Sequence, residues 1–199
     1  MKGQIITGLT PQQKIVAVNN KFGNTNISGQ QGTTRVLFDS LELNGSTELR
    51  FFENAGSRQY PFTNIGSEGN RLNVGETFVV QKVYFGYLET DPDTGAYLSF
   101  ATISNFGAAP WQHGEWSFLI ANSQVIKQLP FQTSFILNQA VTGVNGVDEA
   151  FGTFTDIVIP PLLEFVLTYR IPTYTAVENT RLVCFIEGTA GILAPQTTF

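Results

Sequence analysis

The chain contains one cysteine, Cys184, and one histidine, His113, so chemistry that needs a thiolate or an imidazole must use these two residues. A cysteine nucleophile needs a neighbouring base, a zinc site needs several Cys, His or acidic ligands, and a disulfide needs a second cysteine. Neither residue lies in a recognisable nucleophile motif. We therefore expect Cys184 to be a small buried strand residue and His113 to be an exposed loop residue.

Acidic residues form two groups that invite comparison with known sites. The segment 91–95 (Asp-Pro-Asp-Thr-Gly) resembles the start of a calcium loop, but the twelfth position of such a loop must be Glu and here is Thr102. It therefore predicts a tight turn. Asp148 and Glu149 have no partner that spacing identifies, although glycosidase carboxylates can lie far apart in sequence. We expect no catalytic residue, no metal ligand and no cofactor, and therefore no enzyme activity.

Two tryptophans flank the histidine, and Trp111, His113 and Trp116 could form a platform on which a sugar stacks. This group supports an alternative function, a receptor- or glycan-binding β-sandwich such as a spike or fibre head. The competing interpretation is packing, because Trp116, Phe118 and Ile120 share one parity of a predicted strand. The spacing therefore favours a core position for Trp116.

The composition indicates a protein that assembles. Of 199 residues, 11 are basic and 16 acidic, whereas Thr, Asn and Gln total 49, and there are 17 Phe. The net charge of −5 and the absence of a basic run make specific nucleic-acid recognition unexpected. A free monomer usually keeps a charged surface, while interfaces favour aromatic residues and are depleted in Lys, Glu and Asp. The surface is therefore expected to be buried against neighbours.

The elements that hold these residues are predicted to be strands. Helical periodicity is nearly absent, and short β-rich runs alternate with Gly, Pro, Asn and Asp. Eight antiparallel strands within 72–190 predict an all-β fold, a two-sheet jelly-roll sandwich. Pro130 predicts that the strand it ends lies at an edge or a bend. The expected strands are 77–88, 97–103, 115–121, 123–129, 133–137, 153–159, 163–171 and 181–187, and the expected core contains Phe78, Val80, Trp116, Phe118, Phe165 and Leu167.

Residues 1–71 are predicted to be an extended N-terminal arm with accessory strands, and 191–199 a C-terminal tail. Strands are possible at 14–18, 33–38 and 48–52. The first 32 residues carry only Lys2, Lys14 and Lys21 as charges and are rich in Gln, Asn, Gly and Thr. Such an arm cannot bury enough apolar surface alone to offset its ordering entropy. We expect it to become ordered on neighbouring subunits or on an inner layer.

Four segments within 72–190 resemble the jelly-roll capsid proteins of tailless bacterial viruses: 74–80, which opens a long strand; 123–130, which ends in Leu-Pro; 156–167, with its Ile-x-Ile-Pro turn; and 180–188, which ends in Gly. The resemblance implies a bacteriophage virion protein without catalysis or cofactor. Two jelly rolls need a longer chain, so it implies a single-jelly-roll capsid or capsid-associated subunit.

The expected partners follow from this resemblance. They are copies of the chain itself, other capsid proteins and, through the arm, an internal membrane or inner layer. No cleavable signal peptide and no membrane-spanning run is visible in the sequence. We therefore expect assembly in the host cytoplasm and a final location in the virion.

Overall fold

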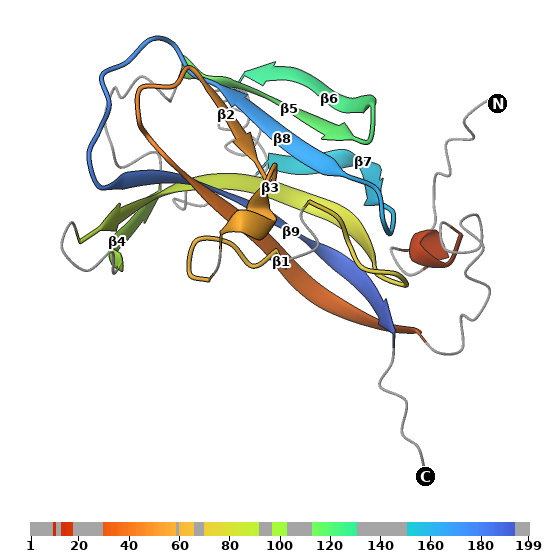
Figure 1. The fold of residues 1–199 in the computed structure, drawn as a ribbon. Coiled ribbons are helices and arrows are strands. Elements are labelled where there is room, and N and C mark those ends of the chain that lie inside the picture. Colours follow the sequence, from red (N-terminus) through yellow and green to blue (C-terminus); the bar gives the residue numbers. More distant parts are fainter. Residues whose placement is uncertain are drawn as a thin grey trace, which may run out of the picture.

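The computed structural model describes residues 10, 13–17, 30–58, 60–65, 70–91, 97–102, 113–130 and 151–193. Nearly all of them lie in, or connect, strands of two antiparallel sheets that pack face to face (Figure 1). The strands are β1 (Gln30–Glu42), β2 (Glu48–Phe51), β3 (Thr77–Thr90), β4 (Tyr97–Thr102), β5 (Glu115–Ile120), β6 (Ser123–Pro130), β7 (Phe151–Ile159), β8 (Phe165–Arg170) and β9 (Thr180–Leu193).

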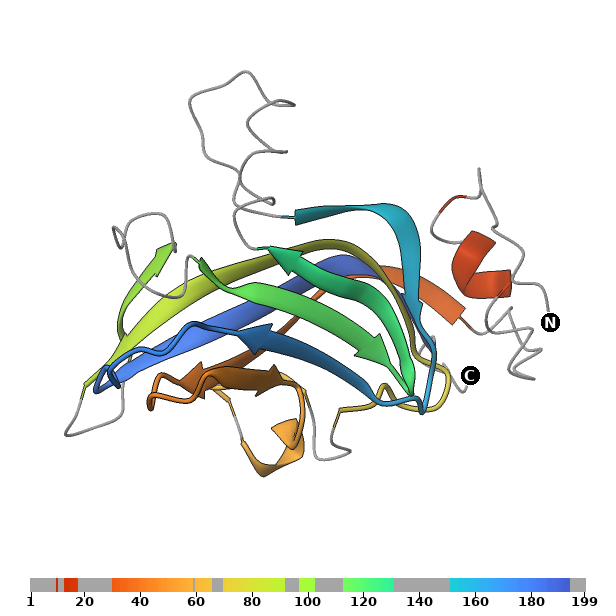
Figure 2. The ribbon, with the colours of Figure 1, turned by 90° about the horizontal axis from the view of Figure 1, so that it is seen from above.

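The topology is that of one long antiparallel ribbon wrapped around itself. Along the ribbon β1 pairs with β9, β2 with β8, β3 with β7, and β5 with β6. Successive pairs belong to alternate sheets. A further pairing joins the pairs within each sheet: β9 with β3 in one, and β8 with β5 in the other. The orders are β1-β9-β3-β4, with β7 also on β3, and β2-β8-β5-β6 (Figure 2). This wrapping produces the expected all-β jelly-roll sandwich.

Strands from the N-terminal part of the chain belong to this sandwich. β1 pairs with β9 along its whole length, and β2 pairs with β8. Leu37, Leu49 and Phe51 from these two strands are buried in the common core. The boundary expected between residues 71 and 72 thus falls inside one packed unit. The strand expected at 133–137 lies outside the described residues.

β9 is longer than its sequence pattern indicated. It continues past the expected end at Glu187 to Leu193, and its last residues pair with the first residues of β1. Residues 191–193 of the expected C-terminal tail are therefore part of a strand. Residues 194–199 lie outside the described part of the chain.

The segment expected to form a strand at 14–18 is helical over residues 13–17. The Thr10 and Gln13 side chains each accept a hydrogen bond from the other residue's backbone amide, at 3.3 Å and 2.9 Å. This reciprocal capping box starts the helix and overrides the β-branched residues that follow. No helix among the described residues has the length and apolar character needed to cross a membrane.

The core lies between the two sheets and is rich in aromatic rings. All six expected core residues (Phe78, Val80, Trp116, Phe118, Phe165 and Leu167) are buried. Phe85 of β3 reaches across the sandwich, with ring centroids 5.9 Å from Trp116 and 4.8 Å from Tyr169. Both faces of β3 are largely buried, because apolar side chains occupy both parities of the strand. β6 ends the order of the four-stranded sheet, as Pro130 predicted.

Candidate functional site

Cys184 and His113 are not placed to act together. Cys184 lies in β9 of the five-stranded sheet and is completely buried, whereas His113 is exposed just before β5 of the other sheet. Burial raises the pKa of the Cys184 thiol well above its ordinary value, and the nearby Asp39 raises it further. A reactive cysteine needs access and a lowered pKa. Cys184 is therefore a core residue.

The proposed sugar platform loses one of its three members. Trp116 has no exposed surface and packs edge-on against Phe85 inside the sandwich. His113 is exposed. Trp111 lies outside the described residues, as do Asp148, Glu149 and residues 92–95 of the turn expected at 91–95. The packing interpretation of Trp116 is therefore correct.

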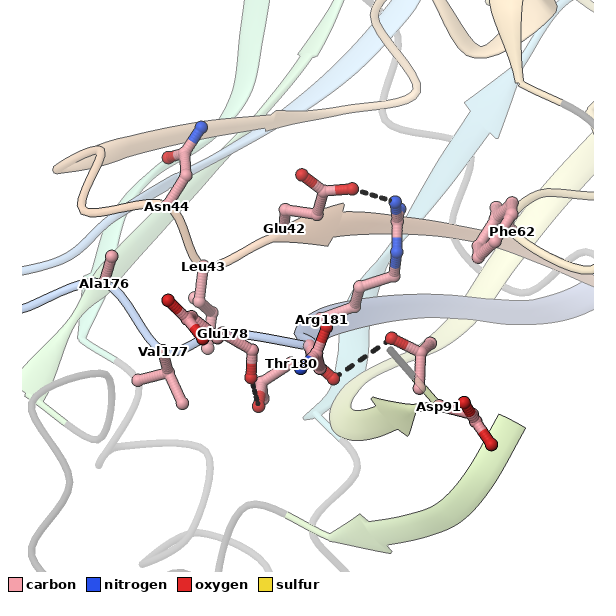
Figure 3. A pocket seen from close by; sticks show the side chains of 12 residues that line it. Glu42, Leu43, Asn44, Phe62, Asp91, Ala176, Val177, Glu178, Thr180 and Arg181 are labelled. Carbon is pink, nitrogen blue, oxygen red and sulfur yellow. Dashed lines mark hydrogen bonds and ion pairs between the residues drawn. The ribbon is translucent and has the colours of Figure 1, made fainter. Parts of the chain in front are cut away.

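A hollow of about 480 Å³ lies at one end of the sandwich, where the connections after β1, β3 and β8 meet and Phe62, from the connection after β2, adds to the lining (Figure 3). Backbone hydrogen bonds tie these connections together: the Leu43 amide donates to the Thr180 carbonyl at 3.1 Å, and the Thr90 amide donates to the Asn179 carbonyl at 2.8 Å. The lining residues are Glu42, Leu43, Asn44, Phe62, Thr90, Asp91, Ala176, Val177, Glu178, Asn179, Thr180 and Arg181.

Arg181 fixes one wall of this hollow. Its guanidinium pairs with Glu42, donates to the Ser40 carbonyl at 3.3 Å, and lies 4.2 Å from the centre of the Phe62 ring. The Arg181 guanidinium is therefore engaged by groups of the wall itself, as Figure 3 shows for Glu42. Among the described residues, no group of three or more His, Cys, Asp and Glu could hold a metal ion. The contacts around the hollow hold its connections in place.

A buried ion pair that spacing did not identify lies at the edge of the core. Asp39 of β1 is completely buried and accepts hydrogen bonds from the Phe52 amide at 2.6 Å and from Arg58 Nη2 at 2.6 Å and Nε at 3.1 Å. Burial raises the pKa of Asp39, and the bonds from Arg58 and Phe52 oppose that rise. The pair attaches the connection after β2 to the inner face of β1.

The ion pairs of the whole sandwich form a pattern. All six arginines of the chain are described, and each pairs with an acidic residue of the same chain. The pairs are Arg35–Glu76, Arg50–Glu53, Arg58–Asp39, Arg71–Glu164, Arg170–Glu48 with Glu115, and Arg181–Glu42. The guanidinium charges are therefore neutralised within the chain.

Comparisons with known proteins identify no family for this chain. No family model matches the chain, and no curated protein matches it. Among solved structures the chain is similar to the major capsid protein P2 from bacteriophage PM2, with 11% identity and a TM-score of 0.38. The alignment covers 84% of this chain and 47% of that one, so the chain spans about half the length of that protein. A similarity this distant carries no statement about function.

Proposed function

We propose that this protein is a virion structural protein: a single-jelly-roll capsid or capsid-associated subunit of a bacteriophage shell. It assembles with copies of itself and with other capsid proteins. Its N-terminal arm reaches an inner layer or internal membrane of the particle. It catalyses no reaction, and it acts in the virion after assembly in the host cytoplasm.

The pairing of every arginine with an acidic residue of its own chain carries this proposal. Burying an unpaired charge in an interface is costly, and interfaces are accordingly depleted in Lys, Glu and Asp. Here 14% of the residues are charged, and every arginine already has an acidic partner in its own chain. A subunit surrounded by neighbours therefore loses little solvation of unpaired cations when it assembles.

The turn between β7 and β8 gives further support. Leu162 at this turn has a left-handed backbone, with φ at 63°, and is 54% exposed. A bulky residue rarely adopts this conformation, which costs of order 1–3 kcal/mol. Its amide donates to the Leu72 carbonyl at 3.0 Å, so the turn is fixed in this form. Contact with a neighbouring subunit would cover the leucine that the turn presents.

Assembly of the purified chain tests the proposal. We expect analytical ultracentrifugation to show species much larger than a dimer, and electron microscopy to show closed shells or sheets, alone or with co-expressed capsid proteins. Leu162→Gly relieves the backbone strain and removes the apolar side chain, so the subunit should stay folded but assemble less. A monomer under every one of these conditions contradicts the proposed function.

A further inference from the structure

The free edge of β1 is divided into a closed half and an open half. The Asn64 side chain accepts a hydrogen bond from the Phe38 amide at 2.8 Å and donates to the Val36 carbonyl at 2.6 Å. The Asn64 amide donates to the Phe38 carbonyl at 3.2 Å, and Thr63 forms a bridge with Asp39. The segment around Asn64 thus acts as a short extra strand that closes this edge from Val36 onward.

The same bonds show which backbone groups of β1 point away from β9. Phe38 and Val36 use their outward groups on Asn64, so the even-numbered residues face the free edge. By this alternation the outward groups nearer the start of β1 belong to Gly32 and Thr34. Among the described residues, the Thr34 carbonyl accepts one hydrogen bond, from the neighbouring Thr33 hydroxyl at 3.3 Å. No described strand pairs with this half of the edge (Figure 1).

This open half lacks the features that protect other edges. β6, at the edge of the other sheet, carries the exposed Lys127 and Pro130 and two register shifts against β5. Charges, prolines and bulges of this kind block edge-to-edge pairing. Residues 30–34 have no charge, no proline and no register shift against β9. β2 presents only four residues. The start of β1 is therefore better suited to accept another strand than the edges at β6 and β2.

We propose that residues 31–35 of β1, which precede the closed half of the edge, pair antiparallel with the same residues of a second copy of this chain, which joins two five-stranded sheets into one. These five residues are centred on Thr33, so a two-fold axis at Thr33 pairs all of them with their copy. In this register Arg35 faces Gln31 of the partner copy, and no like charges meet. The contact deepens the proposed function, on which it rests, by naming the strand through which subunits associate.

Disulfide trapping tests this register. In the proposed pair, the odd-numbered residues that face each other across the two copies form non-hydrogen-bonded pairs. Their Cα atoms therefore lie about 4.5 Å apart, a distance that a disulfide can span. Thr33→Cys should therefore give covalent dimers on mild oxidation. Gln124→Cys, on the exposed β6 edge, is the matched control and should stay monomeric on a non-reducing gel. The native Cys184 is buried and contributes no background.

A second variant tests the backbone contact. Thr34→Pro removes an outward amide that takes no part in the ladder with β9, so the fold should be retained. Thr34→Val keeps that amide and should associate as the wild type does. We expect Thr34→Pro, with a normal circular dichroism spectrum, to lose one association step. The proposal is overturned if the folded Thr34→Pro variant associates normally, or if Thr33→Cys gives no covalent dimer.

These outcomes separate the β1 contact from the proposed function. Large assemblies that Thr34→Pro leaves intact would overturn the β1 contact and support a shell subunit. A wild type that stops at a dimer, which Thr34→Pro dissociates, would support the contact and contradict a shell subunit, because a two-fold pair is closed and a shell needs further contacts.

Discussion

The buried contact between Asp39 and Arg58 makes part of the folding stability depend on pH. The carboxylate has no exposed surface, while the Arg58 side chain is 21% exposed. Burial raises the pKa of Asp39, so the folded protein holds a proton there more tightly than the unfolded chain does. The stability contributed by this group is therefore present at low pH and is lost as pH rises through the folded-state pKa.

Replacing the arginine should strengthen this pH dependence. Arg58→Met removes two of the influences that lower the pKa of Asp39, the hydrogen bonds and the positive charge, so burial raises that pKa further. At pH 7 the variant leaves a buried, unpaired carboxylate, and we expect a loss of about 3 kcal/mol in the free energy of unfolding. At pH 4 the carboxyl is protonated more readily and the loss should be smaller. Urea unfolding at the two pH values measures both.

The matched control is Arg50→Met. Arg50 and Glu53 form an ion pair in which both side chains are at least 36% exposed. Removing such a pair should cost less than about 1 kcal/mol at either pH. An equal loss for Arg58→Met at pH 4 and pH 7 would show that Asp39 does not change its protonation between them.

Individual strands were predictable where one face is buried and the other is not. In β8 the alternation of Phe165, Leu167 and Tyr169 with more exposed residues gives both the strand and its inner face. The end of β9 was not predictable, because Gly-Thr-Ala-Gly at 188–191 has little intrinsic strand preference. Pairing with β1 on one side and β3 on the other keeps this segment extended. Asp39 was missed because Arg58 lies in a connection and follows no period.

Close packing of strands makes one glycine of β9 hard to replace. A Cβ at Gly188 would lie 2.0 Å from the Val79 carbonyl oxygen and 2.9 Å from the Phe78 ring. Gly188 lies beside the register shift between Val80 and Lys82 in β3, so the backbone there has little room to move. We expect Gly188→Ala to lower the free energy of unfolding by about 1–3 kcal/mol or more, as measured by urea denaturation.

Gly45 offers a contrast within the same experiment. It has a positive φ of 88°, and its Cβ would meet no atom closer than 3.8 Å. Gly45→Ala should therefore cost only the backbone strain, about 1 kcal/mol. If Gly188→Ala were no more destabilising than Gly45→Ala, the close approach of β9 to β3 would be wrong.

The whole molecule depends on contacts between distant parts of the sequence. β1 and β9 begin and end the ribbon, and their pairing places the start of β1 at the outer edge of a sheet. The sequence predicted two sheets from the number and pattern of strands. It could not predict which edge stays open, because that depends on Asn64 folding back onto Phe38. The hollow at the end of the sandwich likewise exists only once three connections have met.

A deletion in the N-terminal arm should affect folding and assembly differently. Deleting residues 1–20 removes the short capped helix and its buried Ile15 but leaves every described strand, since β1 starts at Gln30. Losing one buried isoleucine costs about 1.5–3 kcal/mol, so we expect the sandwich to fold with a lower melting temperature. Under the proposed function assembly should be impaired, because the deletion removes the arm that is proposed to contact neighbours or an inner layer.

Ile15→Ser in the full-length chain is the control for this deletion, because it removes the same buried side chain and keeps the arm. Circular dichroism and thermal melting report the fold of both variants, and sedimentation reports their assembly. If the arm itself makes the contacts, the two variants should melt alike while only the deletion fails to assemble. Loss of the fold on deletion would make the arm an integral part of the sandwich, and normal particles would make it dispensable.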